Sequence, residues 1–281
     1  MNHWRRLPKL EHVAKYIDCY WYLEKEGEDI IHNYPKLNPD PTTHLIIASP
    51  NYDYQYVQGD FVQKGSGSHW IFPHRHSFTM DHSFPFRMIG IKFRTGALYS
   101  VKHLLPESSA LSLEKIKRAD TNLLMGLDWF FYQTLLNEGT EAVDKVCDSL
   151  DESLSRFFLN IQDDKHSVLV RQILPLLSNT SIASIGSTVH RSQRTIERSF
   201  LRVTELTLKQ CQSMMRLEDV LNYLYQLDEA EIDWADLVDQ FDFSDQPHLI
   251  RHLKSAIGKT PGEYARERDL TIDIYGDFKL T

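Results

Sequence analysis

A weak internal repeat in the second half of the chain constrains the fold more than any other feature. Residues 182–185 (IASI) resemble residues 234–237 (WADL), and residues 196–200 (IERSF) resemble residues 249–253 (LIRHL). Each copy has the spacing of two short amphipathic helices separated by a polar turn. The repeat predicts an all-helical domain with two helix-turn-helix units, although two unrelated helix pairs could also look alike by chance.

The second copy contains start and stop signals for each expected helix. Asp233 is a suitable cap for a helix over 234–241, and Ser244 for the helix that follows, with Pro247 at its third position. Gly258 is a typical helix stop, because glycine readily takes a positive φ. The sequence TPGE at 260–263 is a capping box, which predicts that another helix begins at once.

The first copy follows the same plan with a weaker stop. Thr180 or Ser181 is the expected cap of the first helix, and Ser192 caps a second helix over 193–203. Glu205 stands where the second copy has its glycine. The periodicity of residues 208–227 predicts a long helix that joins the two copies.

Charge is distributed unevenly over this half of the chain. The formal net charge of the whole chain is -8, which argues mildly against a nucleic-acid partner. Residues 219–245 contain nine acids and no Lys or Arg, whereas 190–203 and 248–260 are basic. The acidic run is expected to be a solvated face, and the alternative is a contact with a basic partner or with the first half of the chain.

The motif residues in the second half resemble the C-terminal DNA-binding domain of the AraC/XylS family of bacterial transcription factors. The match covers roughly residues 165–268 and departs from the family pattern at Asp242, Pro247 and Leu253. The residues that carry it are Phe243, Ser244, Asp245, Gln246, Arg251, Gly258, Lys259, Thr260, Pro261 and Tyr264.

The resemblance implies that two recognition helices enter successive major grooves about 34 Å apart. The implied base-reading residues are Arg194, Glu197, Arg198, Gln246, Pro247, His248, Ile250 and Arg251. The implied phosphate contacts are Ser192, Arg202, Ser244, Lys254, Lys259 and Thr260. Four of the implied base-reading residues have a structural alternative. Arg198 and Arg251 could form ion pairs that hold their helices, Glu197 could form a salt bridge, and His248 could be an ordinary surface residue.

The first half of the chain is predicted to be mostly β-structure. Between about residues 10 and 100, apolar runs such as HLIIAS and FRMIGIKF are separated by Pro, Gly, Asn and Asp. This half resembles an N-terminal domain of unassigned function that is often joined to AraC-type DNA-binding domains. The residues that carry this resemblance are Tyr20, Trp21, Pro39, Asp40, Leu45, Ile46, Asp81, His82, Gly90, Ile91, Lys92, Phe93, Gly96 and Ala97.

The resemblance implies an effector-sensing domain with a β-rich, cupin-like form. A small effector would lie against aromatic side chains of the sheet, and the candidates are Tyr20, Trp21, Tyr54, Tyr56, Trp70 and Phe93. His74 and His76 are weak candidate metal ligands, because alternate residues of a strand share a face. The spacing around them does not complete a cupin metal motif, so neither a metal nor another cofactor is expected.

The predicted fold class is therefore α+β. Residues 1–161 would form the sensor and dimerisation domain (β-rich over 10–100, helical over 112–160), residues 166–270 the DNA-binding domain, and residues 271–281 a tail. Leucines of the helical part, among them Leu123, Leu124, Leu127 and Leu135, would either form a homodimer seam or pack on the sheet.

The expected function is sequence-specific regulation of transcription in the bacterial cytoplasm, at the nucleoid. Double-stranded DNA and RNA polymerase are the expected partners, with a small-molecule effector. No catalysis is expected, because the chain has no nucleophile elbow, phosphate loop or paired-carboxylate motif. The absence of a long apolar run argues against a membrane span, and three distant cysteines indicate a reducing compartment. The alternatives are a cupin-like metal-dependent enzyme with a helical appendage and a protein-interaction module that does not bind DNA.

Overall fold

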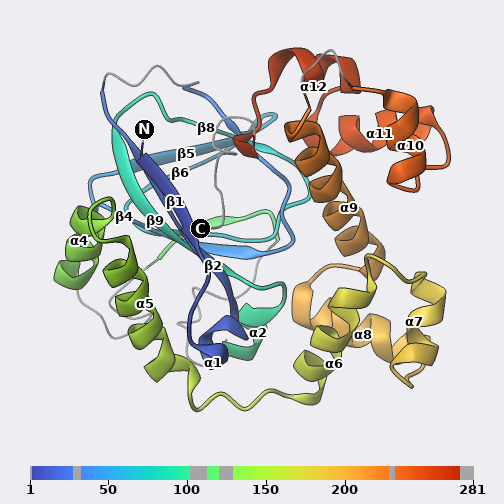
Figure 1. Ribbon diagram of the computed structural model, residues 1–281, viewed down its shortest axis with the longest axis horizontal. Helices are drawn as coiled ribbons and strands as arrows, with labels where there is room; N and C mark the ends of the chain where they lie inside the picture. The colour runs from blue at the N-terminus through green and yellow to red at the C-terminus, as the bar shows by residue number, and fades with distance from the viewer. Residues whose placement is uncertain (1, 28–32, 102–112, 120–128, 228–231, 273–281) are drawn as a thin grey trace.

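The computed structural model describes residues 2–27, 33–101, 113–119, 129–227 and 232–272. It contains a β-rich N-terminal domain and a helical C-terminal domain, which lie beside each other (Figure 1). The predicted α+β class, with strands first and helices after them, is confirmed. Among the described residues, no helix combines the length and the apolar character needed to cross a membrane.

Two antiparallel sheets form the N-terminal domain. The larger has the order β1 (Asn2–Arg6), β2 (Ile17–Lys25), β9 (Phe86–Phe93), β4 (Thr43–Ala48), β7 (His69–Ile71) and β10 (Ile116–Arg118). The smaller has the order β3 (Lys36–Leu37), β8 (Phe78–Met80), β5 (Asp53–Gln58) and β6 (Phe61–Ser66).

The larger sheet is buried on both faces. Alternation along β2 sends Tyr20 and Tyr22 into one core and Leu23 into another. The first core lies between the sheet and the helices α1 (Glu11–Ala14), α2 (Ala97–Val101), α4 (Trp129–Glu138) and α5 (Val143–Phe158). The second core lies between the two sheets.

Helix α5 is attached to the sheet by one buried carboxylate. Asp151 accepts hydrogen bonds from the Tyr20 hydroxyl (2.6 Å) and from the backbone N–H of Lys9 (2.7 Å). Leu135 of α4 is also buried in this core, so here the helices pack on the sheet. Of the proposed dimer seam, Leu123, Leu124 and Leu127 lie outside the described residues.

The helical domain contains two small cores at the two ends of one long helix. Helix α9 (Leu208–Tyr225) joins them, as predicted for residues 208–227 (Figure 1). The first core is built with α6 (Lys165–Ile173), η3 (Leu174–Leu176), α7 (Ile182–Thr188) and α8 (Gln193–Thr204). The second is built with α10 (Trp234–Gln240), α11 (Gln246–Ile257) and α12 (Pro261–Glu267).

Most helix starts and stops lie where the sequence signals predict. Asp233, Ser192 and the 260–263 capping box act as expected, and Glu205 ends α8 with φ of 59° although it is not a glycine. One cap was predicted wrongly. Asp245, and not Ser244, caps α11 by accepting from the backbone N–H of His248 (2.6 Å), so that Pro247 is the second helical residue.

The helical domain contacts the sensor domain at both of its ends. At the first, Arg202 Nε of α8 donates to the Tyr99 hydroxyl of α2 (2.8 Å). At the second, the backbone N–H of Ser77 donates to the carbonyl of Ala256 near the end of α11 (3.0 Å). Beyond α12, residue 270 forms a parallel bridge with Lys36 of β3, which ties the chain's end to the smaller sheet.

We expect the change Gly90→Ala to destabilise the sensor domain. Gly90 pairs with Trp21 across β9 and β2, and a Cβ at position 90 would overlap the Trp21 indole. Overpacking of this kind costs about 1–3 kcal/mol. Chemical denaturation of the two proteins measures the change, and Gly262→Ala is the control because its Cβ would meet nothing within 4 Å. Equal stability of the Gly90→Ala protein and the parent would contradict this packing.

The observed cap of α11 gives a second expectation. Asp245→Ala should lower the free energy of unfolding by about 1 kcal/mol, because an N–H in the first turn loses its acceptor. Ser244→Ala, one residue earlier, should have a smaller effect. Denaturant titration of both variants compares the two residues. A larger loss of unfolding free energy for Ser244→Ala would show that Ser244 is the cap, as the sequence suggested.

Candidate nucleic-acid interface and sensor cavity

The first helix-turn-helix unit consists of α7 and α8. The turn between them places His190 at φ 52°, and Gly186 allows close approach, since a Cβ there would lie 2.9 Å from the Arg191 carbonyl oxygen. Ile196 and Phe200 anchor α8 in the core. The candidate base-reading residues Arg194, Glu197 and Arg198 are exposed on α8.

Glu197 has a partner that the sequence did not indicate. Its carboxylate accepts from the Gln193 side chain (2.9 Å), one turn earlier on the exposed face of α8. Within the described part of the chain no ion pair joins Glu197 to Arg194 or Arg202. The two arginines that carry positive charge on this face, Arg194 and Arg198, are therefore not neutralised by Glu197.

The second unit consists of α10 and α11 and repeats the geometry of the first. Asp242 has φ 53° in the turn, 52 residues after His190, so both turns use a non-glycine residue in the left-handed region. Arg216 of α9 holds this turn, because its guanidinium donates to the Asp242 carbonyl (3.1 Å) and lies over the Phe243 ring. Phe243 is buried, as the sequence predicts for the turn aromatic.

The proposed contact residues of α11 differ in accessibility. Gln246, Pro247, Arg251 and Lys254 are exposed, whereas His248 and Ile250 are half-buried. The His248 ring packs edge-on against Phe243. Arg251 lies 4.0 Å from the Asp245 carboxylate, and both side chains are exposed, so water and salt screen this pair.

Two cations among the candidate phosphate contacts, Lys259 and Arg202, already have protein partners. Lys259 is 7% exposed and is paired with Glu267 and with Asp269 (2.7 Å). Arg202 is exposed but bonded to Tyr99 of the sensor domain. Lys259 thus joins the start of α12 to the segment that follows this helix. The sequence did not predict these ion pairs, because Glu267 and Asp269 lie 8 and 10 residues after Lys259.

Helix α9 fixes the spacing of the two units. Its 18 residues correspond to a length of about 27 Å. The two helix-turn-helix units lie at its two ends (Figure 1). Both α8 and α11 touch the sensor domain near their C-terminal ends, through Arg202 and Ala256, while their first turns remain exposed.

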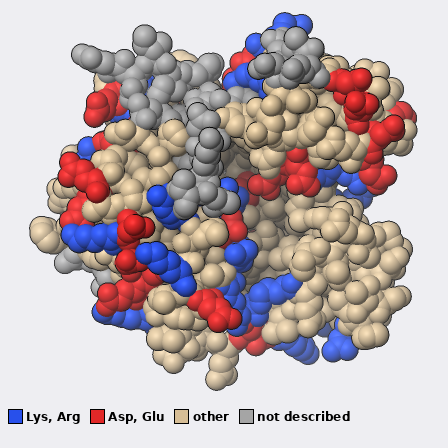
Figure 2. Space-filling view, in the orientation of Figure 1, with Lys and Arg blue, Asp and Glu red and all other residues tan. Residues whose placement is uncertain are grey.

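Part of the acidic run of the sequence lies on the second unit. Asp233, Asp236 and Asp239 are exposed on or beside α10, and acidic side chains gather over this part of the molecule (Figure 2). Helix α10 thus forms a solvated acidic face, and α11 presents its own exposed cations, Arg251 and Lys254.

The sensor domain contains a cavity of about 290 Å³ between its two sheets. Trp21 and Tyr56 line it, as proposed for the effector pocket. Tyr54 belongs to the same core without lining the cavity, and Tyr20, Trp70 and Phe93 lie in the other core, against the helices. The period of two along β2 already separates Tyr20 from Trp21, but the sequence does not show which face carries a cavity.

The two candidate metal-ligating histidines do not share a face. His74 is buried, and its two ring nitrogens lie within hydrogen-bond distance of the Phe72 (3.0 Å) and Asn38 (2.8 Å) carbonyls. His76 is partly exposed and lies 3.5 Å from Glu114. Within the described residues, no group of three or more His, Cys, Asp or Glu side chains could hold a metal ion.

A buried ion pair lies at the edge of the sensor cavity. Lys92 Nζ is 3.1 Å from the Asp40 carboxylate, which also accepts from His44 Nε2 (3.1 Å). Lys92 and the His44 hydrogen bond hold the pKa of Asp40 well below its usual range, although burial opposes this. His44 Nδ1 accepts from the Trp21 indole (3.3 Å), so a continuous chain of hydrogen bonds fixes this wall of the cavity.

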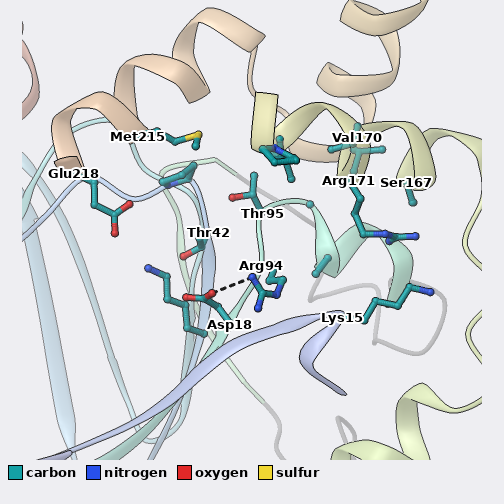
Figure 3. Close-up of a pocket in the computed structure, with 17 residues that line it drawn as sticks. Lys15, Asp18, Thr42, Arg94, Thr95, Ser167, Val170, Arg171, Met215 and Glu218 are labelled. Carbon is teal, nitrogen blue, oxygen red and sulfur yellow. Dashed lines mark ion pairs between the residues drawn. The ribbon is translucent and has the colours of Figure 1, made fainter. Parts of the chain in front are cut away.

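A second cleft of about 500 Å³ lies between the domains (Figure 3). Lys15, Asp18 and Arg94 line it from the sensor domain, and Arg171 of α6 and Glu218 of α9 line it from the helical domain. Arg94 pairs with Asp18 (3.3 Å), and Arg171 pairs with Asp163 (2.5 Å). Lys92 and Glu218 line both this cleft and the sensor cavity, so the two spaces meet at these residues.

Three solved structures show a distant similarity to the chain. ToxT from Vibrio cholerae has 10% identity and a TM-score of 0.46, over 94% of this chain and 97% of ToxT. Unsaturated fatty acid-bound ToxT from V. cholerae strain SCE256 has 12% identity and a TM-score of 0.49, over 92% and 96%. The AraC-like transcriptional activator CuxR has 11% identity and a TM-score of 0.23, over 78% and 86%.

Family models match both halves of the chain. A helix-turn-helix domain matches residues 185–267, and a domain of unknown function, DUF6597, matches residues 5–106. No curated protein matches the chain in sequence. The chain thus joins an N-terminal DUF6597 domain to a C-terminal AraC-type helix-turn-helix domain, in agreement with the resemblance drawn from its motifs.

Proposed function

We propose that the protein is a sequence-specific DNA-binding regulator of transcription, with α8 and α11 as its two recognition helices. The observation that carries this is the pair of helix-turn-helix units at the two ends of α9, each with its first turn exposed. A helix of this kind reads base edges in the major groove with its N-terminal residues. A stiff connector of about 27 Å would hold the pair near the spacing of successive grooves.

The side chains at these positions suit the chemistry of base recognition. Arg194, Arg198 and Arg251 could each donate two hydrogen bonds to a guanine, and Gln246 suits adenine. Half-buried Ile250 and exposed Pro247 suit the methyl group of thymine. Exposed Lys254 suits a phosphate, which positions the protein without reading sequence.

We further propose that the sensor domain modulates DNA binding through an effector. Its cavity is lined by Glu218 and Leu221 of α9, the helix that sets the spacing of the two units. An occupant of the cavity would therefore touch the element on which DNA binding depends.

A protein-interaction module remains the second candidate, and the exposed aspartates around α10 favour it. The two functions differ in how they respond to duplex DNA. Selection from a random duplex pool with the full-length chain enriches a shared sequence if the first proposal holds. Enrichment of no sequence, with no salt-dependent retention of duplexes, would favour the second.

On the enriched duplex, Arg194→Ala and Arg251→Ala should each weaken binding by about 1–3 kcal/mol and relax the preference at one base position. Lys254→Ala should weaken binding to all sequences alike and reduce the salt dependence by about one counterion. Fluorescence anisotropy at several salt concentrations measures both effects.

Arg156→Ala provides a control of equal charge, since Arg156 is exposed on α5 and paired with Glu152 (2.6 Å). It should leave DNA affinity close to that of the parent protein. If Arg156→Ala weakened binding as much as Arg194→Ala, the effect would reflect total charge and not a recognition helix.

A further inference from the structure

The helical domain lines the sensor cavity together with the sensor domain. Helix α9 contributes Glu218, Leu221 and Asn222 to its wall, and the segment after α12 contributes Thr271 and Ile272. That segment is attached to the sensor domain, because the Thr271 hydroxyl donates to the Asn38 side chain (3.1 Å). A molecule in the cavity would thus contact both domains at once.

Most of the cavity wall is apolar. Side chains from both sheets face it, together with the Trp21 indole, and they are Leu23, Leu37, Ile46, Ile71, Met80 and Met88. A volume of about 290 Å³ suits a small molecule, at the lower end of the usual range for ligand sites. The wall therefore favours an occupant with an apolar body.

At the polar end of the cavity, Lys92 and Glu218 can form further hydrogen bonds. Lys92 has three donors, and Asp40 is its one ion-pair partner among the described residues. Glu218 has no hydrogen bond or ion pair within the described part of the chain, although the Lys92 charge acts on it. Although the Glu218 side chain is exposed, partial desolvation raises the pKa of its carboxyl; Lys92 opposes that rise, and Asp40 and Asp18 add to it.

Charge at this end disfavours an ionic occupant. A carboxylate would accept from Lys92 but would lie beside the carboxylates of Asp40 and Glu218. An ammonium group would suit Glu218 but would lie beside Lys92 and Arg5. A group that both accepts and donates a hydrogen bond satisfies the two sides without adding a buried charge.

We propose that the cavity binds a small uncharged molecule with an apolar body and a hydroxyl or carboxamide end, which bridges Lys92 of the sensor domain and Glu218 of α9. The role of this molecule as an effector rests on the proposed regulatory function, whereas its binding does not. Trp21, Asp40, Ile46, His82 and Lys92, which line the cavity, all lie within the region that matches DUF6597.

Matched probes test the proposal on the full-length chain without DNA. Indolyl, phenyl and cyclohexyl groups are each tested in three forms: the substituted ethanol, the substituted acetate and the substituted ethylamine. Calorimetry measures the affinity of the protein for each compound. For at least one scaffold the alcohol should bind about tenfold more tightly than its charged counterparts. The proposal is overturned if none of the alcohols binds, or if an acetate or amine binds as tightly as its alcohol.

The variant Glu218→Gln tests whether Glu218 causes the preference for the alcohol over the acetate. The amide retains hydrogen-bonding capacity but removes the negative charge, so the preference for alcohol over acetate should fall by about tenfold. Asp219→Asn is the matched control, because Asp219 is the neighbouring exposed acid on α9 and, unlike Glu218, does not line the cavity. An unchanged preference in Glu218→Gln, or an equal change in Asp219→Asn, argues against the bridge.

The duplex selection described above keeps the two proposals separate. If alcohols bind and no duplex is enriched, the cavity assignment stands and the regulatory function fails. If a duplex is enriched and no alcohol binds, the regulatory function stands and the cavity assignment fails.

Discussion

Helix α9 is the element on which the rest of the structure depends. It belongs to both small helical cores, through Cys211 and Met214 at one end and Leu217 and Leu221 further along. Its side chains also form part of the wall of the sensor cavity. Helix α9 therefore connects the two helix-turn-helix units to each other and to the wall of the sensor cavity.

Several hydrogen bonds join the two domains. One is the hydrogen bond between Arg202 and Tyr99, and another is the backbone bond between Ser77 and Ala256. Both lie near the C-terminal ends of α8 and α11, the two proposed recognition helices, and away from their first turns. The sensor domain therefore holds both helices without covering the residues proposed to read bases.

Local sequence signals predicted the helical domain well because helix ends are decided by neighbouring residues. Ser192, Asp233 and Thr260 cap the helices that follow them, since a side-chain oxygen can reach only an N–H two or three residues away. The error at Asp245 has the same origin. Ser244 and Asp245 are both good caps, and the burial of Phe243, a tertiary contact, decides where the turn ends.

The sequence by itself determined the order of the β-rich and helical domains, the paired helix-turn-helix units and the caps at Ser192, Asp233 and Thr260, because periodicity and capping are local. The tertiary structure alone decided that Lys259 is enclosed by Glu267 and Asp269, and that Trp21 faces the cavity while Tyr20 does not. It also brought Lys92 and Glu218 to one cavity from different domains. Contacts of this kind depend on how helices and strands pack against one another, so the spacing of residues within one segment does not predict them.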